Sequence, residues 1–103
     1  MYLIREIMYC KPGQVRPLVE KFKAMSRLGE KVGMPMVRIL TDVSAERYWT
    51  LVAEMEVESL QAFEDSMSMT QGSEEDRKEF ESIMKGYHDL VDSGKREIYR
   101  IES

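Results

Sequence analysis

The spacing of apolar residues changes along the chain, and each regular stretch predicts one element of secondary structure. Residues 2–10 are rich in β-branched and aromatic types and run into Pro12 and Gly13, which predicts a strand that ends in a turn. Over residues 15–32 the apolar side chains recur every three or four positions, the pattern of one helix face. Gly33 then ends this helix, which is predicted to span about twenty residues.

Two strands are predicted next, over residues 36–41 and 48–57, and the polar segment between them is typical of a hairpin connection. In residues 48–57 apolar side chains alternate with more polar ones, as expected where the two faces of a sheet differ. The apolar spacing in residues 60–67 indicates a short helix. The residues that follow, 68–72, are predicted to form a loop.

A longer helix is predicted after this loop. Ser73 is a favoured N-cap residue, and the three acidic residues that follow it suit the positive end of a helix. The predicted helix ends at Gly94, and the last strand is predicted over residues 95–102. The apolar stripe of the helix consists of Phe80, Ile83, Met84, Tyr87 and Val91.

The predicted elements follow the order strand, helix, strand, strand, helix, strand, with the second helical region broken in two. This order is typical of α+β proteins with a ferredoxin-like βαββαβ sandwich, in which helices cover one face of a four-stranded antiparallel sheet. The 103 residues contain no linker, low-complexity segment or internal repeat. Residues 1–103 are therefore predicted to form a single domain.

The second face of the predicted sheet also carries apolar and aromatic side chains. Residues 2–10 have such side chains on both faces, whereas a sheet with one face in water alternates more cleanly. We therefore expect a second copy of the chain, related by two-fold symmetry, to cover this face and form a dimeric α/β barrel. Arg5, Ile7 and Tyr9 share that face by alternation and are the predicted interface residues. A monomer with a few exposed aromatic side chains is the alternative.

The composition argues against several classes of partner. A net charge of −4 offers no broad positive field for phosphate backbones, so nucleic acid is not an expected partner. No apolar run has the length of a membrane span, and no membrane is expected. The single Cys10 cannot form an internal disulfide, and the chain does not open like a secretory signal. These features predict a cytoplasmic protein in which Cys10 is a small buried hydrophobe.

Glu6 and His88 are the candidate catalytic residues. His88 is the only histidine and flanks the apolar stripe next to Met84 and Tyr87. These residues, together with Glu6, are predicted to border a pocket between the last helix and the sheet. If buried there, Glu6 would act as a base, because desolvation raises the pKa of a carboxyl group.

Structural roles are the alternative for both residues. His88 is then exposed or held by a structural hydrogen bond, and Glu6 is solvated or paired with Arg38 or Arg100. No cluster of His, Cys and carboxylate side chains has the spacing of metal ligands, so no metal site is predicted. A haem needs only one axial ligand from the protein, and His88 is a residue of that type. A haem cofactor and the absence of any cofactor are therefore both retained as alternatives.

Three features of the opening follow one another in the order found in a known family: the strand at Tyr2–Glu6, the turn at Lys11–Val15, and the helix positions Leu18, Phe22 and Lys23. They resemble the opening of NIPSNAP-type members of the dimeric α/β-barrel superfamily. The similarity extends as architecture over nearly the whole chain, including residues 56–63, where a strand passes directly into a helix.

The resemblance implies a homodimer with a cavity between sheet and helices in each subunit. It implies no single reaction, because the superfamily contains haem degraders, cofactor-free monooxygenases, isomerases and proteins of unknown role. Haem-degrading members typically place an asparagine on the first strand and a tryptophan and a histidine on the second helical region. This chain has no asparagine, Glu6 lies near that position, and the only tryptophan, Trp49, is on a predicted strand.

Two functional hypotheses follow from these observations. The first is a homodimer that binds a small apolar or aromatic molecule in a cavity rich in the chain's nine methionines. The second is a cofactor-free or haem-dependent monooxygenase acting on an aromatic substrate, with His88, Glu6 or Tyr87 handling protons. A purely structural interaction module is a third possibility. Convergence of Glu6 and His88 on one cavity would favour the enzyme.

Overall fold

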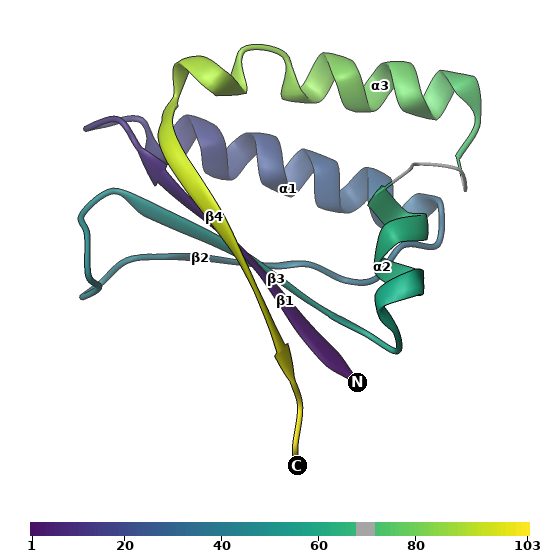
Figure 1. The fold of residues 1–103 in the computed structure, drawn as a ribbon. Coiled ribbons are helices and arrows are strands. Elements are labelled where there is room, and N and C mark those ends of the chain that lie inside the picture. The colour runs from purple at the N-terminus through teal and green to yellow at the C-terminus, as the bar shows by residue number, and fades with distance from the viewer. Residues whose placement is uncertain (68–71) are drawn as a thin grey trace.

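The sheet at the centre of the molecule has four antiparallel strands in the order β2-β3-β1-β4. The computed structural model describes residues 1–67 and 72–103. The first strand of the sequence thus lies between the third and the fourth, as the βαββαβ order requires (Figure 1). The strands are β1 (Tyr2–Cys10), β2 (Arg38–Thr41), β3 (Thr50–Val57) and β4 (Val91–Arg100).

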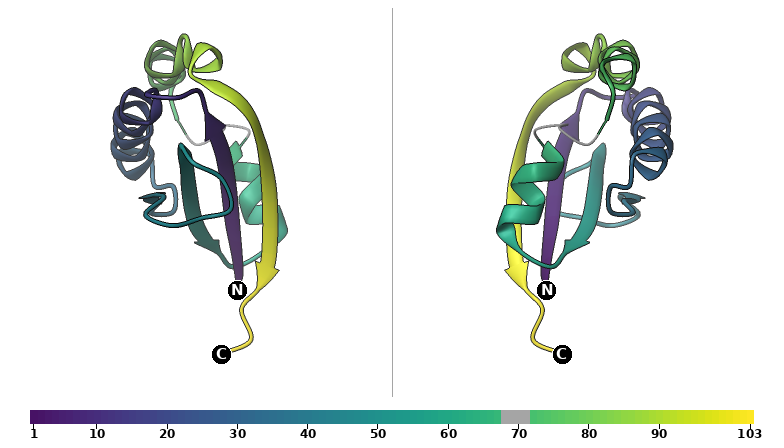
Figure 2. Two further views of the ribbon diagram at one scale, coloured as in Figure 1. Left: turned by 90° about the vertical axis from the view of Figure 1, so that its left-hand side faces the viewer. Right: turned by 90° about the vertical axis from the view of Figure 1, so that its right-hand side faces the viewer.

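The part of the chain that the structure describes has three helices, and residues from all three line one cavity together with residues of a single sheet face. Within the described residues, the opposite face carries no helix, as the two side views in Figure 2 show. This arrangement confirms the predicted ferredoxin-like α+β sandwich. The helices are α1 (Val15–Lys31), α2 (Leu60–Met67) and α3 (Glu74–Met84), and a 3-10 turn, η1 (Tyr87–Asp89), precedes β4.

The hydrophobic core lies between α1 and the sheet. The three- and four-residue spacing of α1 places Leu18, Val19 and Phe22 on its inner face, where each is almost fully buried. They pack against Leu51 and Ala53 of β3. A second, smaller cluster under α2 consists of Ile4, Val57 and Phe63.

The helix α3 packs against α1 and buries no residue fully. Ser73 is the N-cap, as predicted, and it also forms a capping box: the Ser73 hydroxyl accepts from the Asp76 backbone N–H, and Asp76 accepts in return from the Ser73 N–H, both at 3.1 Å. At the other end, Lys21 Nζ of α1 donates to the carbonyl oxygens of Ile83, at 3.1 Å, and Lys85, at 2.8 Å. A cation there suits the negative end of a helix.

The end of α3 and the start of the last strand differ from prediction. The helix ends at Met84, because Gly86 adopts a left-handed conformation with φ of +83° that an α-helix does not continue through. Val91 begins β4 and does not belong to the helix. Gly94 is a strand residue paired with Met8, not a helix stop. A Cβ on Gly94 would lie 3.0 Å from Met8 Sδ and 3.1 Å from the Ile7 carbonyl oxygen, so close approach explains this glycine.

The two middle strands are shorter than predicted. The strand β2 begins at Arg38, and β3 begins at Thr50 because Trp49 has a positive φ of 60° and leaves the extended conformation. The prediction of a loop over 68–72 falls mainly on residues 68–71, outside the described residues. Within the described residues, no helix combines the length and the apolar character needed to cross a membrane.

Candidate functional site

A cavity of about 360 Å³ lies between the helices and the helix-covered face of the sheet. The helix α3 packs against α1 and makes few contacts with the strands. The inner side chains of α3 therefore face an open space between α3 and the sheet. Phe80 and Met84 of α3 and Tyr87 of η1 line this gap. The volume lies within the range of small-molecule sites in proteins.

The cavity wall is almost entirely apolar and unusually rich in thioethers. Unbranched thioether side chains adapt to ligands of varied shape, as at other methionine-rich binding surfaces. The predicted methionine-rich cavity is therefore present as a structural feature. Six of the nine methionines line it: Met8, Met25, Met34, Met55, Met67 and Met84.

Two charged residues, Glu6 of β1 and Arg96 of β4, also line the cavity. They are directly opposite in the strand pairing, and Arg96 Nε donates to Glu6 Oε1. The Arg96 guanidinium carbon also lies 5.0 Å from the centre of the Phe63 ring of α2. Glu6 is thus paired, but not with Arg38 or Arg100 as the alternative interpretation had it. Glu6 is aligned with Ala53 of β3, whereas Arg38 is aligned with Glu54, the next residue along that strand. Arg38 therefore projects from the face opposite Glu6.

The structure brings three of the four predicted pocket residues to one cavity. Glu6, Met84 and Tyr87 line it, whereas His88 is exposed and does not. The cause is the break at Gly86: residues 87–89 form a 3-10 turn, so His88 does not follow the α-helical wheel on which its predicted position rested. The His88 ring instead lies 4.0 Å, centre to centre, from the ring of Tyr87.

Arg96 is the cavity residue that the sequence interpretation missed. The available signal was the alternation along the last strand, which places Arg96 on the same face as Ile98 and Arg100. To assign that face to the cavity, the pairing register of β4 with β1 is also needed, and β4 begins earlier than predicted, at Val91. That start was not predicted.

The residues present do not fit a haem held by His88, because that side chain lies outside the cavity. Among residues 1–67 and 72–103, no three His, Cys, Asp or Glu side chains come together as a metal site would require. Cys10 is buried in the core cluster, and burial raises the pKa of its thiol, with a further rise from the carboxylates of Asp42 and Asp92. Such a thiol is a poor nucleophile.

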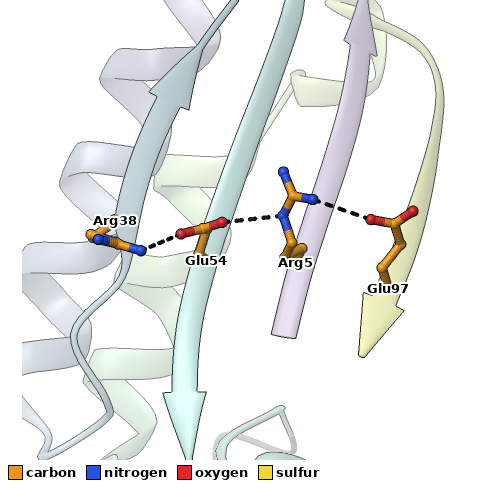
Figure 3. A network of polar contacts seen from close by, with 4 residues as sticks. All are labelled: Arg5, Arg38, Glu54 and Glu97. Atoms are coloured by element: carbon orange, nitrogen blue, oxygen red, sulfur yellow. Dashed lines mark hydrogen bonds and ion pairs between the residues drawn. The ribbon is translucent and has the colours of Figure 1, made fainter. Parts of the chain in front are cut away.

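The face of the sheet without helices carries a row of alternating charges, one from each strand, which we call the charge row: Arg38, Glu54, Arg5 and Glu97 (Figure 3). The strand register places all four at the same height. Arg38 Nη2 lies 2.5 Å from Glu54 Oε1, Arg5 Nε lies 3.1 Å from Glu54 Oε2, and Arg5 Nη1 lies 3.4 Å from Glu97 Oε1.

Apolar side chains flank the charge row on this open face. Arg5, Ile7 and Tyr9, the predicted interface residues, all project from it by strict alternation. Tyr9 is partly covered by its own chain, since the Arg47 guanidinium carbon lies 4.3 Å from the centre of its ring. At the other end of the face, Tyr99 of β4 is paired with Leu3 and is 50% exposed.

No protein-family model matches the sequence, and no curated protein matches it. Solved structures do match. A NIPSNAP domain protein from Burkholderia xenovorans superposes with a TM-score of 0.77 at 8% identity, over 100% of this chain and 96% of that one. A NIPSNAP family protein from Agrobacterium tumefaciens gives 0.75 at 8% identity, over 96% and 90% of the two chains.

A proposed antibiotic biosynthesis monooxygenase from Nitrosomonas europaea superposes with a TM-score of 0.72 at 12% identity, over the full length of both chains. Identities this low establish the fold and not the activity. The resemblance seen in the opening strand, Pro-Gly turn and helix is thus confirmed at the level of architecture: this chain has the ferredoxin-like fold of NIPSNAP-type proteins.

Proposed function

We propose that this protein is a homodimer that binds a small, largely apolar molecule in the cavity between its sheet and helices. The observation that carries the proposal is the cavity of about 360 Å³ with its six methionines. A folded chain normally fills such a space with side chains, because an apolar void forfeits packing energy. A ligand would supply the missing contacts.

The homodimer is supported by the open face of the sheet. This face exposes Tyr99 and Leu40, 50% and 41% exposed, together with the charge row. A second copy is the occupant that the charges favour. When a two-fold axis runs parallel to the strands, β2 lies opposite the partner's β4, so Arg38 faces the partner's Glu97 and Glu54 faces the partner's Arg5. All four positions then meet an opposite charge.

The other two-fold arrangement is disfavoured by the same row. An axis across the strands sets each strand opposite its own copy, and where it crosses them at the charge row it brings Arg5 against the partner's Arg5 and Glu54 against the partner's Glu54. Like charges at an interface cost several kcal/mol. The charge row therefore favours an axis parallel to the strands.

Native mass spectrometry of the purified protein, combined with its mass in solution by light scattering, tests both parts of the proposal. A mass of two chains plus a bound small molecule is the expected result. A mass of one chain at micromolar concentration would overturn the homodimer. A protein that neither retains a molecule nor takes up an added apolar probe would overturn the binding function.

Neighbouring residues of β4 provide a matched pair of interface variants. Tyr99 and Ile98 are similarly exposed, 50% and 45%, but project from opposite faces. Tyr99→Glu places a charge in the proposed interface and should convert the dimer to monomer. Ile98→Glu should leave the dimer intact. Equal behaviour of the two variants would place the dimer contact elsewhere.

Cavity binding has its own matched pair. Met84→Trp adds volume to the cavity wall and should abolish uptake of an uncharged apolar dye such as N-phenyl-1-naphthylamine. Met36→Trp makes the same change at a side chain that is 70% exposed and should leave uptake unchanged. Dye fluorescence at equal protein concentration is the measurement.

A second candidate function, a cofactor-free monooxygenase, is favoured by the structural likeness to the Nitrosomonas europaea protein and by the position of Tyr87 and Glu6 in the cavity wall. Oxygen uptake in the presence of an electron-rich phenol or anthrone tests it. Turnover by the wild type that Tyr87→Phe or Glu6→Gln reduces at least tenfold would support the enzyme. Absence of oxygen uptake with these substrates would leave binding as the function.

A further inference from the structure

Glu6 and Arg96 are the charged residues among those that line the cavity, and their chemistry restricts the ligand. Glu6 and Arg96 meet in the wall of a cavity whose other lining residues are mostly apolar. The contact between them uses Arg96 Nε and Glu6 Oε1. Within the described residues, Glu6 Oε2 has no donor and the Nη groups of Arg96 have no acceptor. An acceptor and several donors therefore lie side by side and free for a ligand.

The arginine side chain is held in place before any ligand arrives. Glu6 fixes it from β1, and the ring of Phe63 supports the guanidinium from α2 at 5.0 Å. Phe63 itself is buried in the smaller core cluster. A positioned guanidinium loses little conformational freedom when it binds, which favours recognition at this point.

The pair carries no net charge, and this determines which polar group it suits. A carboxylate would gain contacts with Arg96 but would lie close to the carboxylate of Glu6, a like charge. A hydroxyl group accepts from Arg96 and donates to Glu6 at the same time. A purely apolar molecule would leave both groups without the water that otherwise solvates them.

We propose, on the basis of the binding function above, that the cavity selects uncharged molecules with an apolar body and a single hydroxyl end, and that Glu6 and Arg96 together recognise that hydroxyl. The six methionines then contact the apolar body. Arg96 and Glu6 are specificity-determining residues under this proposal.

Three probes with one ring system test the proposal: 2-naphthol, naphthalene and 2-naphthoate. Protein with ¹³C-labelled methionine methyl groups reports binding directly, because six methionines line the cavity, while Met1 and Met36 are 55% and 70% exposed and serve as internal references. We expect 2-naphthol to bind about tenfold more tightly than either other probe, the effect of hydrogen bonding to charged partners.

Two variants assign this preference to the ion pair. Arg96→Gln and Glu6→Gln should each reduce the preference for 2-naphthol over naphthalene to about twofold or less, while naphthalene still binds. Both should remain folded, because a partly exposed ion pair contributes little stability. Lys95→Gln, the neighbouring position on the opposite face of β4, should keep the preference of the wild type.

The outcomes separate this proposal from the binding function on which it rests. If all three probes bind with equal affinity, or if 2-naphthoate binds best, hydroxyl selection is wrong while the cavity remains a binding site. If none of the probes shifts the methyl signals of the lining methionines, the binding function itself fails for molecules of this class.

Discussion

Arg5 and Glu54 pair across the two central strands of the sheet, with Arg5 Nε 3.1 Å from Glu54 Oε2. Glu54 is nearly buried although it lies on the face without helices. Its carboxylate is shared with Arg38, and Arg5 is shared with Glu97, so four charges from four strands form one continuous row. Under the proposed two-fold axis, each of these four charges faces an opposite charge of the partner.

A charge swap tests the two-fold geometry proposed from this row. Arg5→Glu should weaken the dimer at least tenfold, because the new carboxylate would meet the partner's Glu54. Adding Glu54→Arg should restore much of the affinity, since both positions again face an opposite charge across the axis. Sedimentation equilibrium gives the dissociation constants, and thermal melts establish that each variant is folded.

A dimer that is insensitive to Arg5→Glu would place the interface on another surface. A double variant that dimerises no better than Arg5→Glu would contradict an axis parallel to the strands. Lys23→Glu, at an exposed position on α1, is the control for a general effect of charge and should leave the dissociation constant unchanged.

Gly94 should not tolerate a side chain. A Cβ there would lie 3.0 Å from Met8 Sδ and 3.1 Å from the Ile7 carbonyl oxygen, and the backbone atom cannot move aside as the thioether can. We expect Gly94→Ala to lower the free energy of unfolding by about 1–3 kcal/mol, the usual effect of overpacking. Urea unfolding followed by circular dichroism measures this change.

Gly29 is the matched control for this substitution. A Cβ at this helical position would lie 3.5 Å from Met34 Cβ, an ordinary van der Waals distance. Gly29→Ala should therefore be neutral or raise stability by up to about 1 kcal/mol through higher helix propensity. A Gly94→Ala protein as stable as Gly29→Ala would contradict the close approach of β4 to β1.

The capping box should make the stability of α3 depend on pH. Hydrogen bonds from the Ser73 backbone and side chain hold the pKa of Asp76 below its ordinary value of 3.8, with a smaller contribution from Lys31. A carboxyl group whose pKa is lowered by folding stabilises the fold at pH values above its pKa in the unfolded chain. This contribution is lost as the pH falls through its pKa in the folded protein. The urea midpoint should therefore drop between about pH 4 and about pH 2.

Substitution of the cap separates this effect from other acid transitions. Ser73→Ala should cost about 0.5–2 kcal/mol at neutral pH, the usual contribution of an N-cap. Asp76→Asn should flatten the acid limb of the stability curve. If Asp76→Asn keeps the full dependence of the wild type below pH 4, another carboxylate is responsible.

Cys10 should be unreactive in the folded protein. Its thiol is buried, and burial and the neighbouring carboxylates raise its pKa above the ordinary 9.0, so the thiolate is scarce near neutral pH. Reaction with Ellman's reagent at pH 8 should be at least a hundredfold slower than in urea-unfolded protein. Because the pKa of Cys10 is higher in the folded protein than in the unfolded chain, the neutral thiol stabilises the fold. This contribution is lost as the pH rises through the pKa of the folded protein.

Fast thiol reaction under native conditions would show that this end of β1 opens readily. Lys11→Ala, which leaves the thiol buried, should react as slowly as the wild type. Equal reaction rates of the wild type and Lys11→Ala would attribute the slow reaction to the burial of Cys10 and not to the charge of Lys11.

The order of the elements and the identity of the fold were predictable from local information. The apolar spacing of residues 15–32, the Pro12–Gly13 turn and the Ser73 cap act through neighbours close in sequence, so the chain itself carries those signals. Alternation along β1 likewise separated Glu6 from Arg5 and Tyr9, because the side-chain period of a strand is two.

Only the tertiary structure decided which side chains form the site. The left-handed Gly86 ends α3 early, and the 3-10 turn that follows leaves His88 exposed. The pairing register of β4 with β1 brings Arg96 opposite Glu6. Glu6 and Arg96 are about ninety positions apart in the sequence. The pairing register of their strands depends on the packing of whole strands and not on the propensity of any one residue. The cavity has the same origin, since the position of α3 on α1 leaves the space that Met84 and Tyr87 line.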